Sequence, residues 1–456
     1  GDGGDWTDVS HWSSSSGGVS ASTVPGQADT VVFDANSFSI PNQEVTINDD
    51  GSFYSMDWSG IVDEHVLIFD STLYAYGDIT LNNKLSLRRN VNFSGIQFMQ
   101  QSVFDADSAS IDCAFRIIMD NTTDSLIFAS DILMSDSSSC ILVTGNLSTQ
   151  GHVLNTGSLK TINNPFSGSD LRSIDISNSN VYLSLEFNSS GDTSLVFDAS
   201  NSVLYIGDTL DFLNNLKTEN LAFNDVTLNF KPLTNLQTIE GDNTFNKLKV
   251  IAGSTIHIKE GSSQTVADSL TLKGDCKDVI TIASSDTSST GNTASLIKLN
   301  SSMDFIGLGL KVQQINALPG ETLTLYHSID NGGNDLGWIF DTTSSVTADF
   351  IANGPFCYGD TTLFTNTSTS SGIINYSWEY NDESYLGNSS GLIEAKTSSV
   401  LNFPQPPGID TTSYGQILSW TEMTDGQSLF SPSSGSAVTT QGYESMNYSF
   451  SIALKR

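Results

Sequence analysis

Apart from the carboxylates, the residues that could perform metal, redox or acid–base chemistry are few and scattered. The five histidines and four cysteines form no Cys-x-x-Cys pair and no Cys/His cluster, so neither a zinc knuckle nor a redox motif is predicted. These residues are His11, His65, His152, His257, His327, Cys113, Cys140, Cys276 and Cys357. We interpret each of them first as a surface or packing residue.

Carbohydrate chemistry would need other groups. A lyase acting on acidic sugars uses a basic residue, with more positive charge or calcium to neutralise the substrate. No basic cluster surrounds the arginines at positions 88, 89, 116, 172 and 456. A glycosidase needs two carboxylates at a defined separation, and among 51 acidic residues some pair fits by chance. We therefore expect no catalytic residues and a non-enzymatic protein, with a polysaccharide-degrading β-helix lyase or glycosidase as the alternative.

Calcium is the one ion that the carboxylates suggest, and no other cofactor is expected. The turns Asn48-Asp49-Asp50-Gly51 and 330–335 place several hard oxygen ligands in short loops, without an EF-hand pattern. The simpler interpretation is a solvated turn in which Asn and Asp are used for their backbone conformation. We assign no metal ligands.

The charge balance limits the partners. With 51 acidic and 18 basic residues, the net charge is −33, which repels nucleic acids and anionic membranes. No apolar run approaches the roughly 20 residues that span a bilayer, and residue 1 is not followed by signal-peptide features. We expect no nucleic-acid partner, no membrane span, and a secretion signal that has been removed or lies outside this sequence.

A short strand motif recurs along the chain and predicts its architecture. Its copies are VVFDAN at 31–36, LIFDST at 67–72, SVFDAD at 102–107, LIFASD at 126–131, LVFDAS at 195–200 and LAFNDV at 221–226. Their spacing is irregular but close to one or two turns of a solenoid, and the runs between them alternate apolar and polar residues. The sequence predicts an all-β protein in which residues 1–340 form a right-handed parallel β-solenoid (β-helix).

Tryptophans mark both ends of this predicted solenoid. A solenoid needs caps because its end coils would otherwise expose strand edges and apolar surface. Trp6 and Trp12 are the candidates at one end and Trp338 at the other. Cys113 and Cys140 are 27 positions apart, close to one coil, so a disulfide between them in an oxidising compartment is a further hypothesis, against incidental buried thiols.

The opening motif resembles a known family. W-x-D-x-x-H-W-S-x-x-S-G-G over 6–18, followed by P-G-x-x-D-x-V-V-F-D-x-N-S-F, is similar to the start of a repeat domain in very large secreted surface proteins of Bacteroidota, including gliding-motility adhesins. The DNGGNDLGWIF segment at 330–340 resembles the end of that domain.

From Val346 the pattern changes. Residues 346–382 resemble the start of a PKD-type, immunoglobulin-like β-sandwich, with Ser377-Trp378-Glu379-Tyr380-Asn381-Asp382 in place of its Trp-Asp-Phe-Gly-Asp segment. The Asn in place of Gly puts the tight turn of that segment in doubt. We predict that 341–456 is such a sandwich with enlarged loops.

The resemblance implies a non-enzymatic adhesin or structural module of a larger protein at the extracellular cell surface, associated with the outer membrane. Export by the type IX secretion machinery, gliding motility, and attachment to surface polysaccharide or a solid substratum are implied with it. So are O-glycans at Asp-Ser/Thr followed by a small or apolar residue, with candidates Ser108, Ser125, Thr209 and Ser269. An anchoring platform for partner proteins is a third hypothesis.

Overall fold

The structure is a computed structural model. It describes residues 3–341 except 163–170, 208–213, 234–235, 275–277, 287–293, 299–302, 319–321 and 334–335, together with the backbone of six strands between 350 and 455. The chain divides into two compact units, of which the first ends at Phe340 and the second continues from Asp341. The described residues contain no α-helix, only a 3-10 turn, η1, at Val9–His11.

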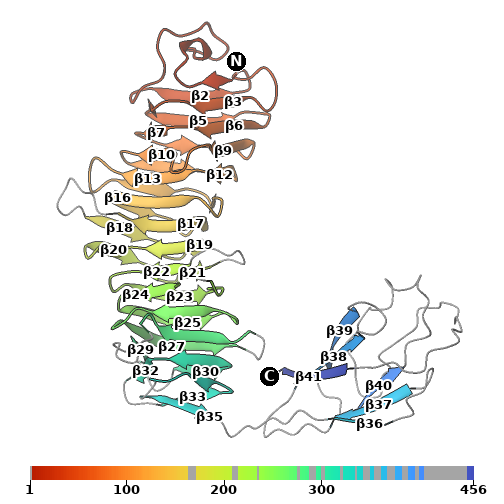
Figure 1. Cartoon of the computed structure of the whole chain (residues 1–456). Coiled ribbons are helices and arrows are strands. Elements are labelled where there is room, and N and C mark those ends of the chain that lie inside the picture. The colour runs from red at the N-terminus through yellow and green to blue at the C-terminus, as the bar shows by residue number, and fades with distance from the viewer. Residues whose placement is uncertain are drawn as a thin grey trace, which may run out of the picture. The chain divides into compact units, whose positions relative to one another are not determined.

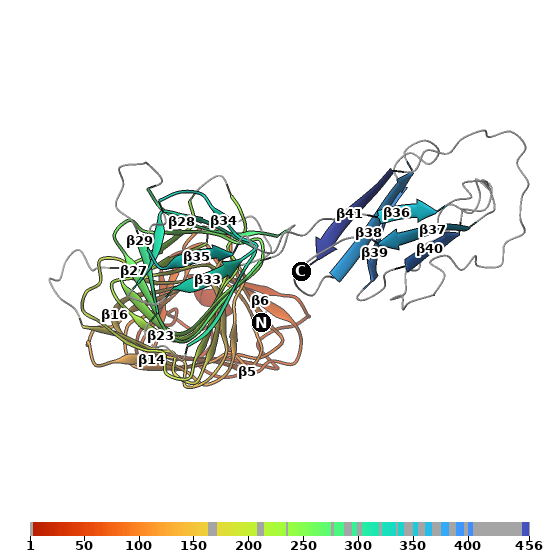
Figure 2. The same ribbon diagram turned by 90° about the horizontal axis from the view of Figure 1, so that it is seen from below.

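The first unit is a parallel β-solenoid of about 11 turns (Figure 1). Three columns of parallel strands run along the stack, and we call them faces A, B and C. Viewed along the stack, the coils superpose around a common interior (Figure 2). The coil length is set by the register: Val45 pairs with Leu67, and Leu67 with Leu87, so a compact coil takes about 20 residues.

Face A contains β1 (Gly4–Asp5), β3 (Glu44–Ile47), β6 (His65–Phe69), β9 (Leu85–Arg89), β12 (Ser110–Asp112), β15 (Ile132–Leu133), the first halves of β17 (Leu154–Thr161) and β19 (Asn180–Asn188), β21 (Val203–Ile206), the second halves of β23 (Ala222–Leu228), β25 (Asn243–Val250) and β27 (Ser263–Lys273), β30 (Asp304–Leu308), β33 (Leu323–Tyr326) and β35 (Trp338–Asp341).

Face B contains β4 (Gly51–Phe53), β7 (Thr72–Ala75), β10 (Gly95–Phe98), β13 (Ala114–Ile118), the first half of β16 (Ser139–Ser148), the second halves of β17 and β19, β22 (Asn215–Lys217), β24 (Thr238–Glu240), β26 (Thr255–Ile258), β28 (Ile280–Ser284), β31 (Leu310–Gln313) and β34 (Ile329–Asp330).

Face C contains β2 (Thr30–Asp34), β5 (Ser55–Gly60), β8 (Ile79–Thr80), β11 (Ser102–Asp105), β14 (Ser125–Phe128), the second half of β16, β18 (Arg172–Asp175), β20 (Leu195–Asp198), the first halves of β23, β25 and β27, β29 (Ala294–Lys298) and β32 (Ile315–Leu318).

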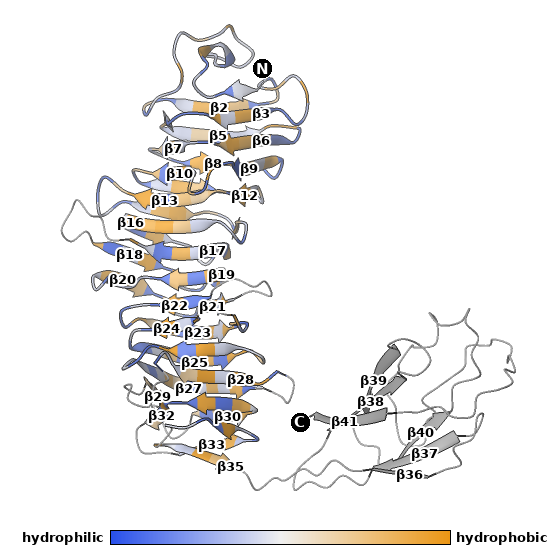
Figure 3. Cartoon of the chain, viewed as in Figure 1, coloured by the Kyte–Doolittle hydropathy of each residue, from blue (hydrophilic) through white to orange (hydrophobic). Residues whose placement is uncertain are grey.

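The alternation of apolar and polar residues in the sequence corresponds to side chains that point into and out of the solenoid. In most of these strands buried residues alternate with exposed or half-buried ones, because successive side chains of a strand point to opposite faces. Figure 3 shows hydrophobic and hydrophilic residues interleaved along the strands. The inward residues form one continuous apolar core, and each fully buried Leu, Ile or Phe contributes about 1.5–3 kcal/mol.

Most copies of the recurrent strand motif lie on face C. Five of its six phenylalanines lie there and pack towards the core, among them Phe104 and Phe128, which are in register and whose ring centroids are 6.4 Å apart. The copy at 67–72 belongs instead to β6 of face A. A similar strand therefore serves on two faces, because both need an inward aromatic residue before a corner.

The aspartate that follows the phenylalanine forms the corner. Asp34 Oδ1 accepts a hydrogen bond from the Asn36 amide at 2.9 Å, and Asp198 Oδ1 accepts one from the Ser200 amide at the same distance. Such side-chain bonds two residues along replace backbone bonds in a tight turn. The left-handed backbone of Asn201 (φ 53°) follows, which Asn tolerates better than most residues.

The N-terminal tryptophans cover the first coil. Trp6 is buried, with its ring centroid 4.7 Å from that of Trp12, whose indole donates to the Trp6 carbonyl at 2.8 Å. A Cβ at Gly51 would lie 2.8 Å from Trp6 Nε1, so glycine is required there by the close approach. At the other end, half-buried Trp338 packs on the core and donates to the Ile315 carbonyl at 2.6 Å.

The second unit contains two antiparallel sheets of three strands, with orders β36-β37-β40 and β39-β38-β41. The strands are β36 (Phe350–Asn353), β37 (Thr361–Asn366), β38 (Asn375–Asp382), β39 (Ser389–Ala395), β40 (Val400–Pro404) and β41 (Ser449–Lys455). Antiparallel pairing sets this unit apart from the solenoid, and the segment 377–382 singled out in the sequence lies within β38.

Candidate functional surface

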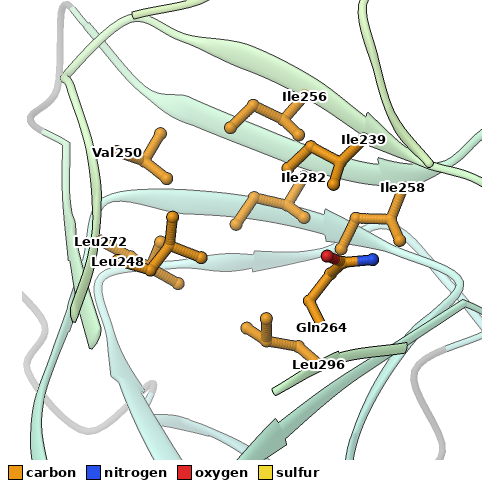
Figure 4. Close-up of a pocket in the computed structure, with 9 residues that line it drawn as sticks. All are labelled: Ile239, Leu248, Val250, Ile256, Ile258, Gln264, Leu272, Ile282 and Leu296. Carbon is orange, nitrogen blue, oxygen red and sulfur yellow. The ribbon is translucent and has the colours of Figure 1, made fainter. Parts of the chain in front are cut away.

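The described part of the solenoid has two small cavities. The cavity among Ile239, Leu248 and seven further residues in the lower half of the stack measures about 10 Å³ (Figure 4), which is at the limit for a single water molecule. A second cavity of about 30 Å³ lies beside His11 and Trp12 at the N-terminal cap. Neither can hold a sugar.

The described residues contain no cluster of three or more His, Cys, Asp or Glu side chains that could hold a metal. In the 48–51 turn, Asp50 accepts hydrogen bonds from Ser71 Oγ at 2.6 Å and Tyr74 OH at 3.2 Å. The Ser71 bond is the main cause of the lowered pKa of Asp50. This carboxylate therefore joins two coils. In the 330–335 turn, Asp330 accepts from the Gly332 amide at 2.8 Å, and 334–335 lie outside the described residues.

The cysteine pair does not form the disulfide that its separation suggests. Cys113 and Cys140 are both free and buried, and burial raises the pKa of each thiol, that of Cys140 to about 12. The register explains the difference, because Cys140 pairs with Phe115 rather than with Cys113. A separation of about one coil is thus not enough, since bridging also requires that the two positions face each other. Cys276 and Cys357 lie outside the described residues.

The candidate O-glycosylation sites fall in different settings. Ser108 is exposed in the turn between β11 and β12, with a left-handed backbone (φ 64°). Ser125 begins β14 and Ser269 lies within β27, both half-buried on strands. Thr209 lies outside the described residues. Accessibility therefore favours Ser108 among the three that the structure describes, and their modification stays a prediction.

Two of the five histidines have a structural role. His65 is buried and stacks on Phe38 with ring centroids 3.8 Å apart, and burial lowers its pKa. Burial also lowers the pKa of His257 in β26. A lowered pKa keeps both rings neutral at pH 7, which agrees with the packing role expected from the sequence.

A buried ion pair in mid-solenoid was not found by reading the sequence. Arg172 donates from Nε to Asp192 at 2.7 Å and from Nη2 at 2.8 Å, with both side chains at most 5% exposed. Its Nη1 donates to the carbonyl oxygens of Val143 and Ile162. The guanidinium thus ties together chain segments from β16 to the turn before β20. No local motif predicts this pair, because Arg172 begins β18 and Asp192 lies 20 positions later in the turn before β20.

The outward side chains form columns, because the coils are in register. On face C the columns are acidic: Asp175 pairs with Asp198, and Asp57 and Asp105 both pair with Thr80. On face A a column contains Asn155, Tyr182, Tyr205, Thr227, Lys249, Thr271 and Ile306. The faces therefore present different chemistry along the same stack.

The fold defines the class of this protein as a parallel β-solenoid with a packed interior and a second, antiparallel unit. Comparisons with protein-family models, with curated proteins and with solved structures find no match. No helix among the described residues has the length and hydrophobicity needed to cross a membrane.

Proposed function

We propose that this chain is a non-enzymatic attachment or structural module of a larger extracellular surface protein. The observation that carries the proposal is the arrangement of outward side chains in columns on a solenoid whose inward side chains form one continuous apolar core. Such a surface offers a row of weak contacts at successive coils. Weak contacts of this kind sum to firm attachment when many act together.

The resemblance of the 6–40 segment to gliding-motility adhesins adds an export route, a location and an attachment target to the proposal. In this proposal the protein is exported by a type IX secretion system, remains associated with the outer membrane, and attaches to surface polysaccharide or a solid substratum. The second unit is a PKD-type, immunoglobulin-like domain, which agrees with its two antiparallel sheets. Its contribution is to space the solenoid from the next module of the larger protein.

One observation favours the alternative of a polysaccharide-degrading enzyme. Asp175 and Asp198 are neighbours on adjacent strands of face C, and glycosidases act through paired carboxylates. Against it, hydrogen bonds from the Ser200 amide and hydroxyl lower the pKa of Asp198, whereas a general acid needs a raised pKa. Both carboxylates also cap turns. Adhesion is therefore the better supported function.

The test is attachment without turnover. Purified protein is expected to bind a polysaccharide-coated surface weakly as single copies and firmly when displayed in many copies on a bead. Release of reducing ends or of unsaturated sugars from any glycan offered would overturn the non-enzymatic assignment. If such release is observed, the D175N/D198N variant tests whether these two carboxylates cause it. Loss of the release in this variant would establish the enzyme alternative.

A further inference from the structure

We propose that face A carries a binding strip for a linear anionic polysaccharide, formed by Tyr182, Tyr205, Lys247, Lys249, Lys273 and Tyr326. We call it the lysine–tyrosine strip. This inference rests on the proposed attachment function and names the ligand class and the residues. It starts from an outer region in which positive charge and exposed aromatic rings occur together.

The register places these residues in neighbouring columns of face A. Tyr182 pairs with Tyr205, Tyr205 with Thr227, and Thr227 with Lys249. Lys273 pairs with Leu308, which pairs with Tyr326. The strip runs from β19 through β21, β23, β25, β27 and β30 to β33, strands that follow one another down the stack (Figure 1). With about 4.8 Å between neighbouring strands, it is about 30 Å long.

The charge of the strip is opposite to that of the protein. The chain carries 51 acidic and 18 basic residues, yet β25 and β27 place three lysines on this face. Lys247 is paired with Asp225 at 3.4 Å. Lys249 and Lys273 are exposed, and within the part of the chain that the structure describes their ammonium groups form no ion pair.

Asp225 is the partner of Lys247, and two further acidic side chains lie at the margin of the lysines. Asp304 is exposed on β30, in register with Ser269. Asp268 is exposed where β27 passes from face C to face A. An anionic polymer is therefore attracted to the centre of the strip and repelled by the acidic columns of face C, so that charge selects both the ligand and the face.

Tyrosines flank the lysines at both ends of the strip. The rings of Tyr182 and Tyr205 are 6.3 Å apart, and Tyr182 and Tyr326 are 43% and 49% exposed. An exposed tyrosine offers a flat apolar face and a hydroxyl that can donate or accept a hydrogen bond. A pyranose ring has the complementary apolar C–H face and hydroxyl rim. Lysines recognise the carboxylates or sulfates, and the tyrosines hold the sugar rings on either side.

The experiment measures binding of the full chain to three soluble polymers by affinity electrophoresis: polygalacturonate, dextran sulfate and uncharged dextran. The test variant is K249E/K273E, which reverses the two charges of the strip that form no ion pair among the described residues. The matched control is K259E/K311E, since Lys259 follows β26, Lys311 lies in β31, and both are exposed on or beside face B. The two variants have the same net charge.

The wild type is expected to bind at least one anionic polymer and not dextran. K249E/K273E should weaken that binding about tenfold, and K259E/K311E less than about twofold. Y182A/Y205A should weaken it with unchanged net charge. Raising salt from about 0.1 M to about 1 M, which shortens the Debye length from about 10 Å to about 3 Å, should weaken it as well. The polymer retained identifies carboxylate or sulfate as the recognised group.

Three results would overturn the strip: no binding of either anionic polymer, equal loss in the test and control variants, or binding of dextran as strong as that of the charged polymers. The proposed function is tested separately by attachment to a polysaccharide-coated surface. If K249E/K273E attaches as firmly as the wild type, the strip is wrong and the attachment function stands. If the wild type attaches to no surface, both fail.

Discussion

Replacing Arg172 by methionine removes the positive charge from a buried pair and leaves Asp192 behind. The two hydrogen bonds to this carboxylate measure 2.7 and 2.8 Å, and Asp192 is 4% exposed. Removing one partner of such a pair costs about 3–5 kcal/mol, because the remaining charge stays buried without compensation. The carbonyl oxygens of Val143 and Ile162 lose a donor at the same time.

The measurement is the free energy of unfolding from denaturant titration of the purified full chain. R172M should lose about 3–5 kcal/mol, and R172M/D192N should recover part of the loss, because no charge is then buried. K247M serves as the control: its pair with Asp225 is exposed, so it should cost at most about 1 kcal/mol. If R172M loses no more than K247M, or the double variant is less stable than R172M, the reasoning is refuted.

The pH dependence follows from the same pair. Burial acts to raise the pKa of Asp192, but the hydrogen bonds and charge of Arg172, with Thr161 and Ser194, outweigh it, so the pKa lies below the ordinary 3.8. A depressed folded-state pKa contributes stability that is present above the unfolded pKa and lost as the pH falls through the folded pKa. The wild type should therefore lose stability below about pH 3.8, and the R172M/D192N variant should lose less over that range.

Further predictions concern the cap, the corners and the thiols. W6A should lower the free energy of unfolding by about 3–5 kcal/mol, since a fully buried aromatic is deleted, and a loss below about 1 kcal/mol would show that Trp6 is not part of the cap. D198A should lower the free energy of unfolding by about 0.5–1.5 kcal/mol, because it removes the acceptor of the Ser200 amide, whereas D198N keeps an acceptor and should cost less. Equal losses in the two variants would contradict the role of the Asp198 side chain in the turn. Cys113 and Cys140 should be alkylated only after the protein is unfolded, and no reductant should be needed. Peptide mass mapping reads the result, and a disulfide-linked peptide containing both cysteines would contradict the register.

Much of the solenoid can be predicted from the sequence, because its two main signals are local. Alternation of apolar and polar residues predicts the strands, and an aspartate after an inward phenylalanine predicts the corner that follows. The change of pattern from Val346 lies shortly after Phe340, where the first unit ends. Which face a strand joins is not local. The copy containing Phe69 looks like the other five and lies on face A.

The surface could be predicted less well, because it depends on the register between coils. Coil lengths vary with the loops, so sequence separation does not tell which side chains face each other. Cys113 and Cys140 are separated by about one coil and are out of register. Tyr182 and Lys249, far apart in the sequence, share one column. Neither the lysine–tyrosine strip nor the Arg172 pair has a sequence signature of its own.

Attachment without turnover is the central claim, and one measurement tests it most directly. Beads carrying many copies of the protein and the same protein as single copies are applied to a polysaccharide-coated sensor, while the fluid is assayed for released reducing ends. Firm attachment of the beads, weak binding of single copies and no released sugar are expected. Released reducing ends, or beads that detach as readily as single copies, would contradict the account.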